Sequence, residues 1–242
     1  MMSLRGIKLV TLDATNTILK FRVPPWQHYA AVAQDFGFIV DAQQVKKQML
    51  GGFKSMSKDH PNFGRNTIAW EEWWRKLVQS SFTGLLPSST NVNDIANRLI
   101  EDFKTTKCWK RADGGEKLLK LLHDKGVSVG VISNYDPRLR EVLQNINFGN
   151  HFDFIVTSYD VGFSKPDKNI FNHAMQLNKN LVPEQCLHIG DDVEKDYEGA
   201  RAAGWHAVLV AAELAETPPA GKHVFKDLNA LNLAIQKDEL VL

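Results

Sequence analysis

Cysteine is scarce in this chain, and its two cysteines stand far apart. Cys108 and Cys186 form no CxxC pair within the 242 residues. A disulfide framework needs several cysteines, and the common zinc sites need closely spaced ones, so the sequence argues against both. The scarcity also favours a reducing compartment. We therefore expect an intracellular protein, with the cytoplasm favoured and the nucleus or an organelle left open.

The chain also lacks an excess of charge and a long apolar run. Its 29 Lys and Arg residues nearly balance its 28 Asp and Glu residues. Proteins that bind nucleic acid or anionic membrane surfaces are usually strongly basic, so we expect neither partner here. No run of about 18 apolar residues occurs, and no transmembrane helix is expected. Residues 1–8 are too short for a signal peptide ahead of the first apolar segment.

What is present is an ordinary globular composition in a fairly long chain. Hydrophobic residues make up 43% and charged residues 24%, as in typical soluble domains. The length allows one large domain, or a core domain that carries a sizeable insertion. None of these features predicts an oligomeric state.

Short apolar segments alternate with helical patterns along most of the chain. The apolar segments predict buried parallel strands over residues 7–13, 127–133, 152–157, 186–190 and 206–210. Amphipathic patterns predict helices over residues 116–125, 137–146, 166–177 and 194–203. Asp136 is expected to cap the second of these helices, with Pro137 at its first position. The alternation predicts the α/β class, with a Rossmann-like, doubly wound parallel sheet.

More than 100 residues separate the first predicted strand from the second, too many for a single crossover connection. Helical patterns fill much of this stretch, over residues 26–36, 42–58, 69–82 and 92–103. Asp41 is expected to cap the second of them. We therefore predict an all-helical insertion. The predicted domains are residues 1–20 with 110–242 for the core and 21–109 for the insertion.

Residues able to do chemistry follow four of the predicted strands. They are Asp13, Thr15 and Thr17 at the first strand, Ser133 and Asn134 at the second, Lys165 beyond the third, and Asp191, Asp192 and Asp196 after the fourth. Because the carboxyl ends of parallel strands meet at one edge, where such folds bind ligands, we expect these side chains in one crevice.

Several of these residues are suited to holding a hard divalent cation. Mg²⁺ prefers oxygen ligands, and carboxylates supply them. We expect Asp13 and Asp191 to bind Mg²⁺ together with the backbone carbonyl of Thr15. Asp192 is expected to share or position the ion, and the choice between Asp191 and Asp192 stays open. Thr17 is expected to support this group.

The remaining residues suit phosphoryl transfer to a carboxylate. Asp13 would attack the phosphorus and carry the phosphoryl group until water removes it. Lys165 would neutralise the charge of the transferring group, and Ser133 and Asn134 would bind the substrate oxygens. Asp196 is expected to cap the next helix or to orient Lys165.

The order and spacing of these residues resemble those of the haloacid dehalogenase (HAD)-like hydrolase superfamily. The matching segments are Asp13–Thr17, Ile132–Asn134, Lys165–Asp167 and His188–Asp196. The resemblance covers nearly the whole chain. It implies a hydrolase acting on a small phosphorylated molecule, with the insertion as the cap domain that selects substrate. Segments 62–65, 73–76 and 134–138 are similar more narrowly to the group of rhythmically expressed gene 2 and HAD-like hydrolase domain-containing 3 proteins.

Two residues depart from the family pattern. Thr15 stands where family phosphatases usually carry a second Asp, which protonates the leaving group and activates water. Loss of such an acid–base group typically costs about 10²–10⁴-fold in rate. A slow Mg²⁺-dependent phosphatase, a non-catalytic binder of a phosphate-bearing ligand and, more distantly, a 2-haloacid dehalogenase therefore stay open. Asn16 stands where Gly is common, and Asn tolerates left-handed backbone better than most residues.

Two further features favour packing over function. His188 lies inside a predicted strand, and we expect it to be a hydrogen-bonded core residue rather than a catalyst. Trp70 and Trp74 stand four residues apart on one helical face, and we expect them to pack within the insertion.

Overall fold

The computed structural model describes residues 4–178, 180–211, 223–240 and 242. The chain forms two compact units. The core unit comprises Met1–Lys20, Arg111–Asn134 and Asn147–Leu242, and the helical unit comprises Phe21–Lys110 and Tyr135–Ile146. The helical unit thus takes in a second segment, 135–146, beside the continuous stretch that the sequence suggests. No helix in the described part of the chain is both long and apolar enough to cross a bilayer.

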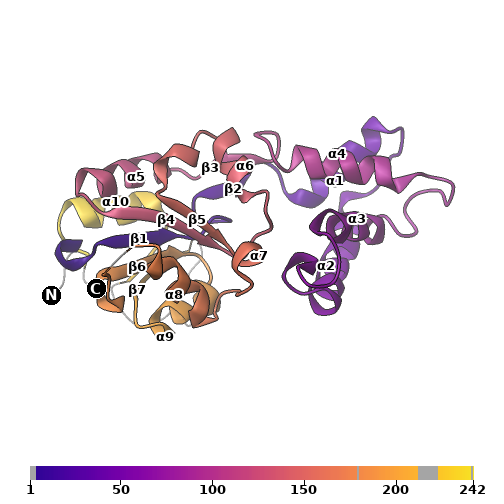
Figure 1. Cartoon of the computed structure of the whole chain (residues 1–242). Coiled ribbons are helices and arrows are strands. Elements are labelled where there is room, and N and C mark those ends of the chain that lie inside the picture. Colours follow the sequence, from indigo (N-terminus) through magenta and orange to yellow (C-terminus); the bar gives the residue numbers. More distant parts are fainter. Residues whose placement is uncertain (1–3, 179, 212–222, 241) are drawn as a thin grey trace. The chain divides into compact units, whose positions relative to one another are not determined.

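A six-stranded sheet in the order β5-β4-β1-β6-β7-β8 forms the centre of the core unit, and all of its neighbouring strands are parallel (Figure 1). The strands are β1 (Leu9–Leu12), β4 (Ser128–Ser133), β5 (Phe154–Thr157), β6 (Cys186–Gly190), β7 (His206–Val210) and β8 (Val224–Phe225). The parallel order confirms the predicted α/β class. β8 has only two residues, too few for a recognisable pattern.

Helices cover both faces of this sheet. α5 (Gly115–Asp124) and α10 (Leu228–Gln236) lie on one face, and α8 (Lys168–Gln176) and α9 (Gly199–Ala202) lie on the other (Figure 1). Between the sheet and α8 and α9 is a hydrophobic core that includes Leu9, Ile132, Phe171, Cys186 and Trp205. Burial of these apolar side chains stabilises the strands, and the strands carry the polar site residues at their carboxyl ends. Shorter elements of the core unit are η1 (Leu4–Gly6), η3 (Gly149–His151), α7 (Ser158–Val161) and η4 (Pro183–Gln185).

The predicted helix over residues 194–203 is divided in two. It begins as a π-helical turn, η5 (Val193–Glu198), and continues as α9. The carbonyl of Asp192 accepts the N–H groups of both Asp196 and Tyr197, at 3.0 and 3.2 Å, which widens the turn. π-Helical turns of this kind are frequent at functional sites.

The widened turn brings Asp196 back onto the end of β6. A Cβ atom on Gly190 would lie 2.2 Å from the Asp196 carboxyl carbon, so only glycine fits beside that side chain.

The helical unit contains the four predicted helices. They are α1 (Pro25–Asp35), α2 (Ala42–Asp59), α3 (Trp70–Ser81) and α4 (Val92–Asp102), with the short η2 (Asn62–Gly64) between α2 and α3. Asp41 caps α2 as predicted, accepting the Gln43 N–H at 2.8 Å. Their core is formed by residues such as Tyr29, Val45, Val78 and Leu99.

The helix expected from Pro137 begins two residues later, as α6 (Leu139–Asn145), with Arg138 at its N-cap position. Asp136 still binds the backbone N–H two residues ahead, as Asp41 does at α2. Its Oδ1 accepts both the backbone N–H and the Nε–H of Arg138, each at 2.9 Å.

Two short strands lie where the chain passes between the two units. β2 (Leu19–Phe21) and β3 (Trp109–Arg111) form a two-stranded sheet. Their three residues each are too few for an alternating pattern to be recognised.

Candidate active site

Asp13 follows β1 directly and is 7% exposed. Its backbone N–H donates to the Ile189 carbonyl at 2.9 Å, so the sheet itself holds the residue at the carboxyl edge. Its Oδ1 accepts a hydrogen bond from Lys165 Nζ at 2.6 Å. The predicted nucleophile and the predicted cation, 152 residues apart, are therefore direct partners.

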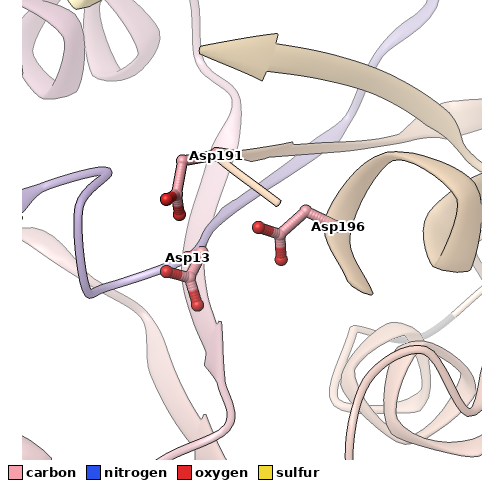
Figure 2. A group of neighbouring side chains, drawn as sticks. All are labelled: Asp13, Asp191 and Asp196. Carbon is pink, nitrogen blue, oxygen red and sulfur yellow. The ribbon is translucent and has the colours of Figure 1, made fainter. Parts of the chain in front are cut away.

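Three carboxylates meet at this edge. Asp13, Asp191 and Asp196 each offer one oxygen, and these oxygens lie within 4.8 Å of one another. Figure 2 shows the three side chains grouped beside one another. Thr17 Oγ1 donates to Asp191 Oδ1 at 3.4 Å, in keeping with a supporting role. A cluster of this kind has the ligand chemistry that divalent cations such as Mg²⁺ require.

Asp196 differs from the other two because its own neighbours occupy its oxygens. Its Oδ1 accepts from Lys165 Nζ at 2.6 Å and from His188 Nε2 at 3.2 Å. Its Oδ2 accepts from the Asp192 N–H at 3.0 Å. We infer that Asp13 and Asp191 are the oxygen donors left for a cation, and that Asp196 orients Lys165.

Asp192 lies outside the acidic cluster. Its Oδ1 accepts the Lys195 N–H at 2.9 Å, and its Oδ2 pairs with the Lys195 ammonium group. Burial acts to raise the pKa of Asp192, but the hydrogen bonds from Lys195 outweigh it and lower the pKa. The structure therefore brings Asp191, and not Asp192, to Asp13.

Lys165 is almost fully buried and makes three hydrogen bonds through Nζ. Besides Asp13 and Asp196, it donates to the Ile132 carbonyl at 2.8 Å. Burial acts to lower the pKa of Lys165, yet the charges of Asp13 and Asp196 outweigh it and raise the pKa. Lys165 is accordingly held as an ammonium ion between two carboxylates.

Asn134 holds the backbone of this lysine. Its Nδ2 donates to the Lys165 carbonyl at 2.9 Å, and its Oδ1 accepts the Lys165 N–H at 2.7 Å. The Lys165–Pro166 peptide bond is cis. With its amide thus engaged, Asn134 holds the Lys165 backbone in place, and its contact with substrate stays a prediction.

Ser133 and Thr15 offer hydroxyl groups that the described residues leave unused. Ser133 ends β4 and is 2% exposed, and within the described ranges its hydroxyl makes no hydrogen bond. Thr15 is half-buried in the turn after Asp13, which is closed by a 2.8 Å hydrogen bond from Asn16 N–H to the Leu19 carbonyl. Asn16 has the positive φ of 63° that its side chain tolerates.

The cluster carries more negative than positive charge. Its three carboxylates and one ammonium group leave two unbalanced negative charges, which one divalent cation would neutralise. Lys20, whose ammonium group donates to the Asn16 carbonyl, offsets only part of this charge, through Asp191.

The pKa values of the three carboxylates reflect burial first and the neighbouring charges second. Burial raises the pKa of Asp13 to about 7, with Asp196 and Asp191 adding to the rise and Lys165 opposing it. Burial and the charge of Asp196 also raise the pKa of Asp191. Burial acts to raise the pKa of Asp196 too, but Lys165 and His188 outweigh it and hold this pKa well below its usual range.

His188 is a buried, hydrogen-bonded residue, as the sequence predicts, but its position beside the acidic cluster is not predicted. Its ring bridges Thr11 and Asp196. The signal that could have pointed to it is the period of two along strands, since His188 and Gly190 share a face of β6, as Thr11 and Asp13 do along β1.

Comparisons with known proteins agree with this geometry. A family model described as haloacid dehalogenase-like hydrolase matches residues 7–204. The chain is 40% identical to the Rhythmically expressed gene 2 protein of Drosophila melanogaster over 221 residues, which cover 87% of this chain and 85% of that protein. It is 35% identical to the Haloacid dehalogenase-like hydrolase domain-containing protein 3 of Bos taurus, with 85% of this chain and 82% of that protein covered.

Solved structures share the fold at lower identity. The magnesium-bound HAD-hydrolase YfnB from Bacillus subtilis has a TM-score of 0.70 at 18% identity, covering 95% of this chain and 99% of that one. A 2-haloacid dehalogenase from Pseudomonas syringae pv. Tomato has a TM-score of 0.67 at 19% identity, covering 96% and 99%.

Proposed function

The chain belongs to the haloacid dehalogenase-like hydrolase family, and from this premise we propose that it is a Mg²⁺-dependent phosphatase or phosphotransferase that works through Asp13. Its substrate is a small phosphorylated metabolite. The observation that carries the proposal is the position of Asp13, which lies between the Lys165 ammonium group at 2.6 Å and the carboxylate of Asp191.

The residues support a two-step transfer. A carboxylate oxygen of Asp13 attacks the phosphorus, and the bond from phosphorus to the leaving oxygen breaks, with the electron pair departing on that oxygen. Water then attacks the phosphorus, the bond to Asp13 breaks, and inorganic phosphate leaves with the free carboxylate restored. Lys165 and the free hydroxyl of Ser133 are the groups suited to binding the phosphoryl oxygens.

Mg²⁺ fits the donor set of this site. Asp13 and Asp191 supply hard oxygen ligands, the Thr15 carbonyl is proposed as a third, and the cluster's unbalanced charge calls for a divalent ion. When bound, Mg²⁺ would supply the positive charge that offsets repulsion between Asp13 and an anionic phosphoryl group. Asp192 is proposed to act indirectly, by capping η5.

Thr15 makes slow turnover part of the proposal. A threonine hydroxyl cannot readily protonate a leaving oxygen near neutral pH, so the proton must come from solvent. Substrates with acidic leaving groups should therefore react best.

We propose that the helical unit is the cap that selects the substrate, with residues 21–109 as its main part. A lid that excludes water strengthens the electrostatic interactions within a site. Point substitutions across this segment should change which substrate is preferred while leaving the rate with p-nitrophenyl phosphate nearly unchanged.

The test is hydrolysis of p-nitrophenyl phosphate with and without Mg²⁺, together with acid trapping of the phosphoenzyme. Asp13→Asn should reduce both turnover and trapped phosphate to background, a loss of at least about 10⁴-fold. Asp192→Asn is the matched control, because it removes a neighbouring carboxylate from outside the cluster. Absence of turnover and of phosphoenzyme in the unaltered protein, across a panel of phosphorylated metabolites, would refute the proposal.

Two other functions are compatible with a threonine at position 15. A 2-haloacid dehalogenase needs no leaving-group acid, since halide departs without a proton, but it leaves the cation-binding carboxylates without a use. Halide release in the presence of EDTA would favour it. A non-catalytic binder would hold phosphate tightly with Mg²⁺ and form no phosphoenzyme.

A further inference from the structure

A buried chain of hydrogen bonds runs from β1 across β6 to the nucleophile. Thr11 and His188 are register partners on these adjacent strands, and Thr11 Oγ1 lies 2.8 Å from His188 Nδ1. On the other side of the ring, Nε2 lies 3.2 Å from Asp196 Oδ1. That same oxygen accepts from Lys165 Nζ, which also donates to Asp13.

The contacts determine which ring nitrogen carries the proton. Asp196 is held ionised and can only accept, so Nε2 must be the donor. The ring is fully buried, and burial, together with the nearby Lys165 charge, lowers the pKa of His188 despite the opposing effect of Asp196. A neutral ring with the proton on Nε2 leaves Nδ1 as an acceptor, which the Thr11 hydroxyl satisfies.

The groups around the ring support this arrangement. Phe171 of α8 packs edge-on against the imidazole, with ring centroids 5.3 Å apart. The charged groups of the chain of hydrogen bonds are Asp196, Lys165 and Asp13, and all of them lie beyond Nε2. On the Nδ1 side lies the neutral Thr11, which faces the ring with its hydroxyl and its backbone. The imidazole ring is therefore oriented with Nε2 toward Asp196 and Nδ1 toward Thr11.

From this geometry we propose that His188 is a positioning residue for Asp13, acting through Asp196 and Lys165. The inference rests on the proposed function, because Asp13 is taken as the nucleophile. By donating from Nε2, His188 fixes the Asp196 oxygen that Lys165 needs, and Lys165 in turn fixes the attacking carboxylate. Indirect partners of this kind typically change activity by about 10–100-fold when removed.

Two amide substitutions test the contacts of the two ring nitrogens separately. Glutamine places its amide near the position of Nε2 and can still donate to Asp196. Asparagine is shorter, reaches only the position of Nδ1, and can satisfy Thr11 alone. His188→Gln should therefore keep the rate of phosphoenzyme formation within about threefold, whereas His188→Asn should lower it about 10–100-fold with little change in KM.

The measurements are single-turnover phosphoenzyme formation with p-nitrophenyl phosphate and Mg²⁺, and the thermal unfolding temperature of each variant. Equal loss of rate in both variants, in proportion to a lowered unfolding temperature, would mean a purely structural histidine and overturn the proposal.

A second readout does not depend on turnover. In ¹⁵N NMR at pH 7.5, His188 should be neutral with its proton on Nε2, and the Lys165 ammonium resonance should move in His188→Asn but not in His188→Gln. A proton on Nδ1, or a Lys165 resonance that ignores both substitutions, overturns the inference even if the protein has no phosphatase activity. If the unaltered protein forms no phosphoenzyme but the NMR result is as expected, only the proposed function is refuted.

Discussion

Both units bury charged side chains, but they balance them differently. In the helical unit, Asp136 and Arg138 are 0% and 5% exposed and form a matched pair with Nη2–Oδ2 at 2.6 Å. Trp74 Nε1 donates to the same Asp136 oxygen at 2.8 Å. The rings of Trp70 and Trp74 lie 5.1 and 4.7 Å from the guanidinium carbon. In the core unit, three carboxylates lie close together, and only two of them, Asp13 and Asp196, pair with the buried Lys165 in the described part of the chain.

This difference in charge balance distinguishes a structural ion pair, Asp136 with Arg138, from a site that binds a ligand. Burial acts to lower the pKa of Arg138, but Asp136 outweighs it and raises the pKa, so the pair is saturated by its own members and by aromatic faces. The acidic cluster of the core unit keeps unbalanced charge and unused oxygens. Buried charge that a protein does not neutralise from within is a sign that a ligand does so.

Breaking the matched pair should have the largest effect. Asp136→Leu leaves the Arg138 charge buried and unpaired, and should lower the free energy of unfolding by about 3–5 kcal/mol in urea denaturation. Mg²⁺ should not restore this loss. Adding Arg138→Met should recover most of it, and failure of the double variant to do so would contradict the interpretation of a self-contained pair.

The next test increases the excess of negative charge in the acidic cluster of the core unit. Thr15→Asp adds the acid–base group that the family pattern leads one to expect, and should raise turnover of esters with poor leaving groups by about 100-fold. The added charge should also lower the unfolding temperature without Mg²⁺. Thr15→Asn adds similar bulk without the acid and serves as the control. A rate that does not change for Thr15→Asp would show that another group already supplies the proton.

The close approach of Asp196 to β6 provides a smaller test. Gly190→Ala introduces a Cβ that the Asp196 carboxyl group must avoid, and such overpacking costs about 1–3 kcal/mol. We expect loss of phosphoenzyme formation along with this destabilisation. Gly6→Ala, whose added Cβ has no neighbour within 4 Å, is the control for glycine replacement.

The smallest effect concerns pH. Because burial raises the pKa of Asp13 from 3.8 to about 7, the metal-free fold should lose stability as pH rises from 3.8 to about 7, with little further loss above that pH. Mg²⁺ has to displace the Asp13 proton below that pH. The stabilisation that Mg²⁺ gives should therefore be about 1.4 kcal/mol smaller at pH 6 than at its high-pH plateau. Thermal unfolding with and without Mg²⁺ measures it, and Asp13→Asn should remove the dependence.

The sequence predicts the fold well where a repeating pattern decides the outcome. Predicted bounds agree fully for β6 and β7, because each is a short, mostly apolar segment with the length of a buried strand. Elements of two or three residues, such as β3 and β8, give no period to read. The parallel order of the strands also brings Asp13, Lys165 and Asp191 together as expected.

The choice of partner within the site could not be read from the sequence. Asp191 and Asp192 are adjacent and chemically identical, and only the local Lys195 decides that Asp192 turns away. The contact of the Asn134 amide with the Lys165 backbone likewise could not be read from the sequence. Such assignments depend on competition between hydrogen-bond partners in three dimensions, which spacing along the chain does not record.

The π-helical turn η5 has a consequence for how the chain tolerates insertions and deletions. A turn of this kind holds one residue more than an α-helical turn, and each residue of an α-helix turns the direction of the side chain by about 100°. Removing one residue between Val193 and Asp196 would restore regular helix and swing the Asp196 carboxylate away from Lys165. The apolar core beneath it would still close. Deletion of a single residue in η5 should therefore abolish activity while the chain still folds.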